Sequence, residues 1–170
     1  MSGLDELRVS FFQECEDLLE SLGDGLRQMS DAADTPPSDE TTETVHAVFR
    51  AVHSIKGGAG AFGLDDLVTF AHLFETVLDH MRDGKMPITS ESMHVLLRAG
   101  DMLSDLVGCA RDDLTPDADR ASPTQTIPSR LKKSLARLGE AFGVWSEPIQ
   151  SSLPSPSPSS RSAARVTRRS

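Results

Sequence analysis

Apolar residues recur every three or four positions in four successive segments of this 170-residue chain, and this spacing most constrains its fold. In an α-helix the spacing gathers the apolar side chains on one face, whereas a half-buried β-strand requires strict alternation. No segment alternates in that way, so the sequence predicts an all-α domain. The apolar positions are Leu4, Leu7, Phe11, Phe12, Cys15, Leu18, Leu19, Leu22, Leu26 and Met29 in the first segment; Val45, Val48, Phe49, Val52, Ile55 and Ala59 in the second; Leu64, Leu67, Ala71, Phe74, Leu78 and Met81 in the third; and Met93, Leu96, Leu97, Leu103, Leu106, Val107 and Ala110 in the fourth.

Turn-forming residues separate these segments. A Pro-Pro pair at 36–37 ends the first helix, because proline cannot continue it, and Ser38 is the expected N-cap of the second. Gly63 is expected to follow the second helix in a left-handed conformation, and Gly84 follows the third. Short connections favour antiparallel neighbours, so we expect an up-down four-helix bundle over about 4–111.

The C-terminal part of the chain differs in composition. A polar loop is expected at 112–126, followed by a fifth helix at about 129–142 with Leu131, Leu135, Leu138 and Phe142 inward. The last 20 residues hold eight Ser and three Pro and cannot bury a core. We therefore expect one domain at 1–145 and a Ser/Pro/Arg-rich linker or tail at 146–170.

Charge and composition exclude several classes of function. Residues 1–120 carry a net charge of −15, which disfavours nucleic-acid binding, whereas residues 121–170 carry +6. No apolar run approaches the ~20 residues of a membrane span, so no membrane insertion is expected. Cys15 and Cys109 have no paired spacing, which favours a cytoplasmic protein with free thiols.

One stretch of the second helix is not explained by the fold. Three glycines at 57, 58 and 60 each cost roughly 0.5–1 kcal/mol in a helix interior relative to alanine. On a helical wheel His53 lies about a right angle from the apolar stripe, at the rim of the core. Gly57 shares its face, so a bulky partner could approach the imidazole closely.

The third helix offers a carboxylate to this histidine. Antiparallel packing could bring Glu75 beside His53, where it would accept the Nδ1 proton and leave Nε2 as the exposed, more nucleophilic nitrogen. Lys56, one turn from His53, would offset negative charge on a group attached there. The alternative for Glu75 is an ordinary solvated carboxylate.

These residues resemble a known family. The sequence HSIKGGAG at 53–60, preceded by FR at 49–50 and followed by FG at 62–63, resembles the histidine phosphotransfer (HPt) domain. It is most similar to the N-terminal phosphotransfer domain of CheA-type chemotaxis kinases. The sequence HLFE at 72–75 resembles the second motif of that family, and the resemblance covers about 4–142.

The resemblance implies that His53 is a phosphoacceptor and that Glu75 orients its imidazole. The other candidate site residues belong to a supporting polar network (Lys56 and His72) and to a partner-binding face (Arg50, Gly57 and Gly60). Lys56 and His72 could equally be ordinary surface residues.

The implied function is that of a phosphocarrier. An ATP-bound kinase domain, in cis or in trans, would phosphorylate His53, and a CheY-like or CheB-like response-regulator receiver would take the phosphoryl group on an aspartate. The domain would be no enzyme on its own, although its parent chain would be a protein-histidine kinase. It would bind no metal or cofactor itself, with ATP on the kinase domain and Mg²⁺ on the receiver.

Three alternative interpretations exist. The chain could be a standalone HPt protein of a phosphorelay, or a non-catalytic helical interaction bundle, which would leave the glycines unexplained. A di-iron bundle needs two Glu-x-x-His motifs, and this chain has a single His-x-x-Glu in reversed order at 72–75, so the metal interpretation fails.

Overall fold

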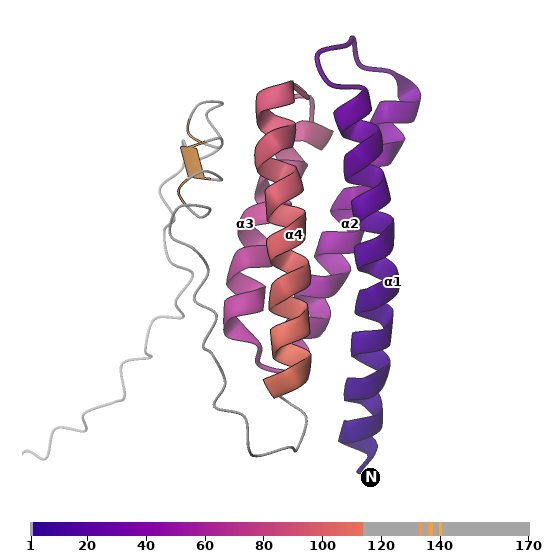
Figure 1. Ribbon diagram of the computed structural model, residues 1–170, viewed down its shortest axis with the longest axis vertical. Helices are drawn as coiled ribbons and strands as arrows, with labels where there is room; N and C mark the ends of the chain where they lie inside the picture. Colours follow the sequence, from indigo (N-terminus) through magenta and orange to yellow (C-terminus); the bar gives the residue numbers. More distant parts are fainter. Residues whose placement is uncertain (1, 114–132, 134–135, 138–139, 141–170) are drawn as a thin grey trace, which may run out of the picture.

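The structure is a computed structural model that describes residues 2–113 and positions 133, 136, 137 and 140. Residues 2–113 contain four helices joined by short connections: α1 (Gly3–Asp31), α2 (Asp39–Ala61), α3 (Asp65–Arg82) and α4 (Ser90–Asp113). Figure 1 shows them running alternately up and down, with α1 and α3 each packed against both α2 and α4. The prediction of four helices is confirmed, and the described residues contain no strand.

The predicted helix ends are found close to where turn chemistry places them. The Ser38 side chain caps α2 by accepting the backbone N–H of Thr41 at 3.1 Å. Gly63 and Gly84 follow α2 and α3 with φ of +67° and +70°, the left-handed conformation that glycine adopts at no steric cost. Each connection therefore reverses the chain within a few residues.

The core is apolar and receives side chains from all four helices. The stripe predicted for α1 is buried only from Phe11 onward, since Leu4 and Leu7 are 62% and 63% exposed. The physical reason is length: the Phe11 ring packs against Phe62, which directly follows α2, and the first turns of α1 extend beyond that level (Figure 1). These two leucines have the helical spacing, but none of the helices within residues 2–113 lies opposite them.

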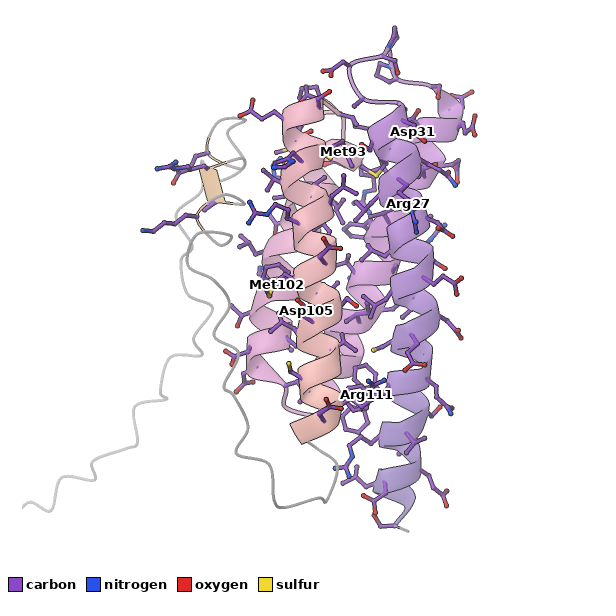
Figure 2. The ribbon with its side chains drawn as sticks, viewed as in Figure 1. Arg27, Asp31, Met93, Met102, Asp105 and Arg111 are labelled. Carbon is purple, nitrogen blue, oxygen red and sulfur yellow. The ribbon has the colours of Figure 1, made fainter. Side chains whose placement is uncertain are left out.

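Close backbone contacts set the spacing between α1 and its neighbours. A Cβ added at Gly25 would lie 2.4 Å from Val48 Cγ2 of α2, and one at Gly100 would lie 2.8 Å from Leu26 Cδ1. Arg111 reaches from α4 to Glu16 of α1, with Nη1 and Oε1 2.6 Å apart (Figure 2). Exposed ion pairs of this kind contribute at most about 1 kcal/mol, so apolar packing holds the bundle together.

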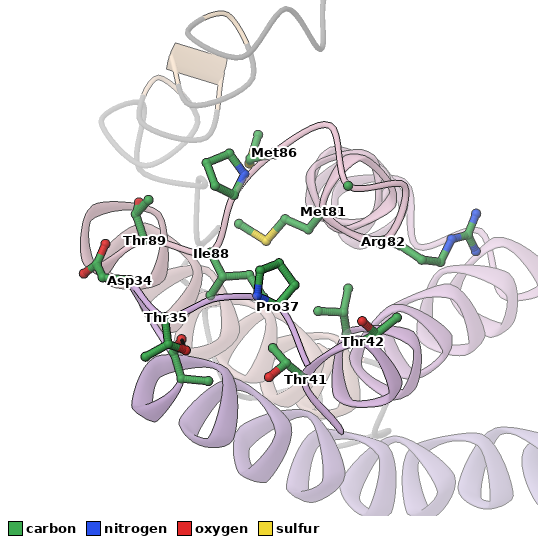
Figure 3. A pocket seen from close by; sticks show the side chains of 14 residues that line it. Asp34, Thr35, Pro37, Thr41, Thr42, Met81, Arg82, Met86, Ile88 and Thr89 are labelled. Carbon is green, nitrogen blue, oxygen red and sulfur yellow. Dashed lines mark hydrogen bonds between the residues drawn. The ribbon is translucent and has the colours of Figure 1, made fainter. Parts of the chain in front are cut away.

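The two connections at one end of the bundle are tied together through Asp34. This residue has a φ of +61°, donates its N–H to the Ile88 carbonyl at 3.0 Å, and accepts the N–H of Ser90 at 3.1 Å. A hollow of about 340 Å³ lies at this end, lined by residues of the two connections such as Thr35 and Ile88 and by Met81 in the last turn of α3 (Figure 3). None of the predicted site residues lines it.

Several predictions concern the C-terminal part of the chain. Most of the fifth helix expected at 129–142 lies outside the described residues, as do the domain boundary near 145 and the tail at 146–170. The four described positions of this segment are helical. None of the helices in the described part is both long enough and apolar enough to span a membrane.

Candidate functional site

The structure brings His53 of α2 and Glu75 of α3 into contact. The imidazole is 61% exposed, and its Nδ1 lies 3.3 Å from Oε1 of Glu75. The two residues meet because α2 and α3 are antiparallel neighbours and each side chain lies at the edge of its apolar stripe. The juxtaposition expected from the sequence is thus present.

Lys56 completes a three-residue cluster. Its Nζ lies 2.7 Å from Oε2 of Glu75, and both side chains are largely covered, at 23% and 14% exposed. Each oxygen of the carboxylate therefore faces a different nitrogen of α2. The carboxylate thus lies within ion-pair distance of both side chains.

The carboxylate of Glu75 is held ionised. Burial is the largest single influence and raises the pKa of Glu75, but the contacts and charges of Lys56 and His53 together outweigh it. The pKa consequently lies below its ordinary value of 4.5. An ionised carboxylate only accepts hydrogen bonds, so Nδ1 of His53 carries the proton and the lone pair of the neutral ring lies on Nε2.

The aromatic ring of Phe49 lies against the imidazole. The two ring centroids are 5.9 Å apart and the planes are inclined by only 16°. On α3, the guanidinium carbon of Arg82 lies over the Phe49 ring, 4.2 Å from its centroid. The apolar spacing predicts Phe49 only as a member of the core stripe; the signal for its second contact is its position four residues before His53, which places both residues on one face of α2.

The glycines of α2 have two different surroundings. A Cβ added at Gly58 would lie 2.2 Å from Cε2 of Phe11, so this residue is small because α1 packs against it. Gly57 and Gly60 are exposed and have open space where a side chain would project. Arg50 is exposed one turn before His53. The open face therefore follows the same side of α2 as the imidazole.

His72 is the predicted site residue that the structure does not bring into the cluster. It is exposed on α3, and in the described part of the chain its ring forms no hydrogen bond or ion pair with His53, Lys56 or Glu75. It lies one helical turn before Glu75, on the same side of α3, but it is exposed to solvent. Among the described residues, no group of three or more His, Cys, Asp or Glu could hold a metal ion.

Comparison with known proteins decides the family. The family model described as "Hpt domain" matches residues 6–140, which include both motifs and the whole cluster. The chain belongs to the Hpt domain family. This Hpt domain carries His53 on α2 and Glu75 on α3, within the matched region.

Curated relatives of this Hpt domain are chemotaxis proteins. The chemotaxis protein CheA of Rhizobium meliloti is 52% identical over 109 residues, which are 64% of this chain and 14% of the relative. The chemotaxis protein CheA of Cereibacter sphaeroides is 54% identical over 139 residues, 81% of this chain and 18% of the relative. The chain thus spans less than a fifth of the length of these relatives.

A solved structure shares the fold of this Hpt domain. It is the phosphorylated P1 domain of CheA3 in complex with CheY6 from R. sphaeroides, with a TM-score of 0.63 and 21% sequence identity. The likeness covers 82% of this chain and 97% of that domain.

Proposed function

We propose that this domain is a phosphocarrier and that His53 is its phosphoacceptor. The observation that carries the proposal is an exposed imidazole whose Nδ1 faces the ionised carboxylate of Glu75 at 3.3 Å. This pairing leaves Nε2 as the nucleophilic nitrogen. The open face at Gly57 and Gly60 lets a partner's reacting group approach that nitrogen.

The chemistry requires two in-line displacements. The lone pair of Nε2 attacks the γ-phosphorus of ATP held by a kinase domain, the new N–P bond forms, and the P–O bond to the leaving ADP breaks. The ring retains its Nδ1 proton and becomes cationic, a charge that Glu75 stabilises across the Nδ1–Oε1 contact. In the second step an aspartate oxygen of a receiver attacks the phosphorus, and the electron pair of the N–P bond returns to Nε2.

The relatives indicate the partners. Since both are CheA, we infer a parent chain that is a histidine kinase, in which an ATP-binding domain phosphorylates His53 in cis or in trans. The P1 domain in the solved complex is bound to CheY6, so we infer a CheY-like or CheB-like receiver as the acceptor. The receiver would bring Mg²⁺, and the domain alone would catalyse no turnover. We place it in the cytoplasm, with a fifth helix at 129–142.

Phosphorylation by a CheA-type kinase core tests the proposal. With radiolabelled ATP, the wild-type chain should gain an acid-labile, alkali-stable label, and His53→Gln should gain none while it folds normally. His94→Gln is the matched control, because His94 is exposed on α4, and it should label like the wild type. Undiminished labelling of His53→Gln would move the site to another histidine. No label on any variant would favour a non-catalytic interaction bundle.

A further inference from the structure

A row of three side chains from two helices ends at the imidazole of His53. Arg82 of α3 lies over the ring of Phe49, and the ring of Phe49 is stacked on the imidazole. Arg82 is itself held by ion pairs with Asp79 and Asp83. The Phe49 ring therefore contacts two groups: the guanidinium of Arg82 from α3 and the imidazole of His53 on α2.

The contact with Glu75 alone does not determine the orientation of the imidazole. An N–H···O hydrogen bond is usually about 2.9–3.0 Å long, whereas Nδ1 and Oε1 are 3.3 Å apart. One such bond fixes the direction of the Nδ1–H vector but lets the ring plane turn about that vector. Because the ring is 61% exposed, core packing does not supply the missing restraint.

Phe49 supplies a restraint of the complementary kind. Two rings 5.9 Å apart and inclined by 16° lie within the range of favourable offset stacking, which resists tilting of either plane. The i,i+4 spacing on α2 fixes the distance between the two attachment points. The Arg82 cation faces the ring and limits rotation of Phe49 in turn.

We propose that Phe49 is a positioning residue for phosphotransfer, which holds the plane of the His53 imidazole so that Nε2 stays directed at incoming partners, and that Arg82 holds Phe49. The inference rests on the proposed function of His53. It adds Phe49 to Glu75 as a second residue that orients the imidazole. Phe49 is only partly buried against the core, and the inference gives this residue a role besides apolar packing.

The test compares Phe49→Leu with a matched variant. An aromatic pair contributes an energy equivalent to about a two- to tenfold change in the population of the stacked conformer. Phe49→Leu should therefore lower the rate constant of His53 phosphorylation by about that factor, with little change in the KM for the kinase. Phe49→Tyr should restore the rate. Phe62→Leu is the control. It removes a partly buried aromatic contact, the one between Phe62 and Phe11, and leaves the surroundings of His53 unchanged.

NMR of the imidazole separates positioning from a general loss of stability. In Phe49→Leu the ¹⁵N and ring-proton signals of His53 should show averaged ring orientations, whereas in Phe62→Leu they should match the wild type. Arg82→Met should shift the His53 signals in the same direction, with a smaller loss of phosphorylation rate. This variant replaces Phe49→Leu in the test if Phe49→Leu fails to fold. Wild-type rate and signals in a folded Phe49→Leu, or equal rate loss in Phe62→Leu, would overturn the inference. Labelling of His53→Gln would instead overturn the proposed function.

Discussion

Nζ of Lys56 lies 2.7 Å from Oε2 of Glu75, whereas Nδ1 of His53 lies 3.3 Å from Oε1, the other oxygen of the same carboxylate. The lysine is three residues after the histidine, so one turn of α2 provides both partners of a single carboxylate on α3. Since the carboxylate is largely covered, it would be costly to ionise without a cation beside it. Lys56 thus keeps Glu75 charged, and Glu75 in turn orients His53.

Removal of the Glu75 carboxylate should slow phosphorylation while the fold is retained. Loss of a positioned acid–base partner lowers rates by about 10²–10⁴-fold, and we expect the lower end because Glu75 orients the ring and transfers no proton. Initial rates with a CheA-type kinase core, measured for Glu75→Ala, check this. A wild-type rate at unchanged helical content would return Glu75 to the class of ordinary surface carboxylates.

The same carboxylate should make stability depend on pH. The pKa of Glu75 is lowered in the folded state, so its contribution is fully present above the ordinary value of 4.5 and is lost as the pH falls through the folded pKa. The difference in unfolding free energy between wild type and Glu75→Gln should therefore shrink as the pH drops below about 4.5. Urea unfolding from pH 7 to 3 measures this. A constant difference across that range would contradict the ionised state of Glu75.

Substitution of the neighbouring glycines 57 and 58 of α2 by alanine should change the unfolding free energy in opposite directions. Gly57→Ala meets open space and should raise the unfolding free energy by up to ~1 kcal/mol, because alanine favours the helix. Gly58→Ala would place its Cβ 2.2 Å from the Phe11 ring and should destabilise the bundle by about 1–3 kcal/mol. Thermal unfolding of the two variants under one condition makes the comparison, and equal shifts would refute it.

A long side chain at Gly57 should block transfer to the receiver. Gly57→Arg projects into the open space on the His53 side of α2, where it would hold a partner away. Displacement of the reacting atoms by ~1 Å can cost on the order of 100-fold in rate. Transfer from the phosphorylated variant to a CheY-like receiver should fall by about this factor, with the melting temperature unchanged or higher. Transfer at the wild-type rate would show that no partner docks on this face.

Cys15 should be unreactive in the folded protein. Burial raises the pKa of its thiol to about 12, with a smaller contribution from Glu14, so almost no thiolate exists at pH 8. Treatment with iodoacetamide at pH 8, followed by peptide mass analysis, should show Cys15 unmodified until denaturant is added. Rapid alkylation without denaturant would mean that α1 separates readily from the bundle.

Local signals in the sequence were sufficient to predict the four helices of residues 2–113. The apolar spacing, the Ser38 cap and the glycines at 63 and 84 act within a few residues, and each is found as predicted. Spacing alone also indicated that Leu4 and Leu7 would be buried, and this was wrong. A helical face is buried only where another helix lies opposite it. The apolar spacing within one helix does not show how far the neighbouring helix extends.

The four helices, their order and the histidine with its glycine-lined face could be predicted from the sequence, since all of these depend on residues close together in the chain. The approach of Glu75 to His53 was also expected, but the other contacts between helices and all of their distances are known only from the folded bundle. The Lys56–Glu75 pair, the contact of Phe11 with Gly58 and the stack of Arg82 on Phe49 each join different helices. Their distances depend on helix register and side-chain rotamers, which are set by the packing of the whole core. For that reason Gly58 proved to be a packing residue and His72 stayed outside the cluster.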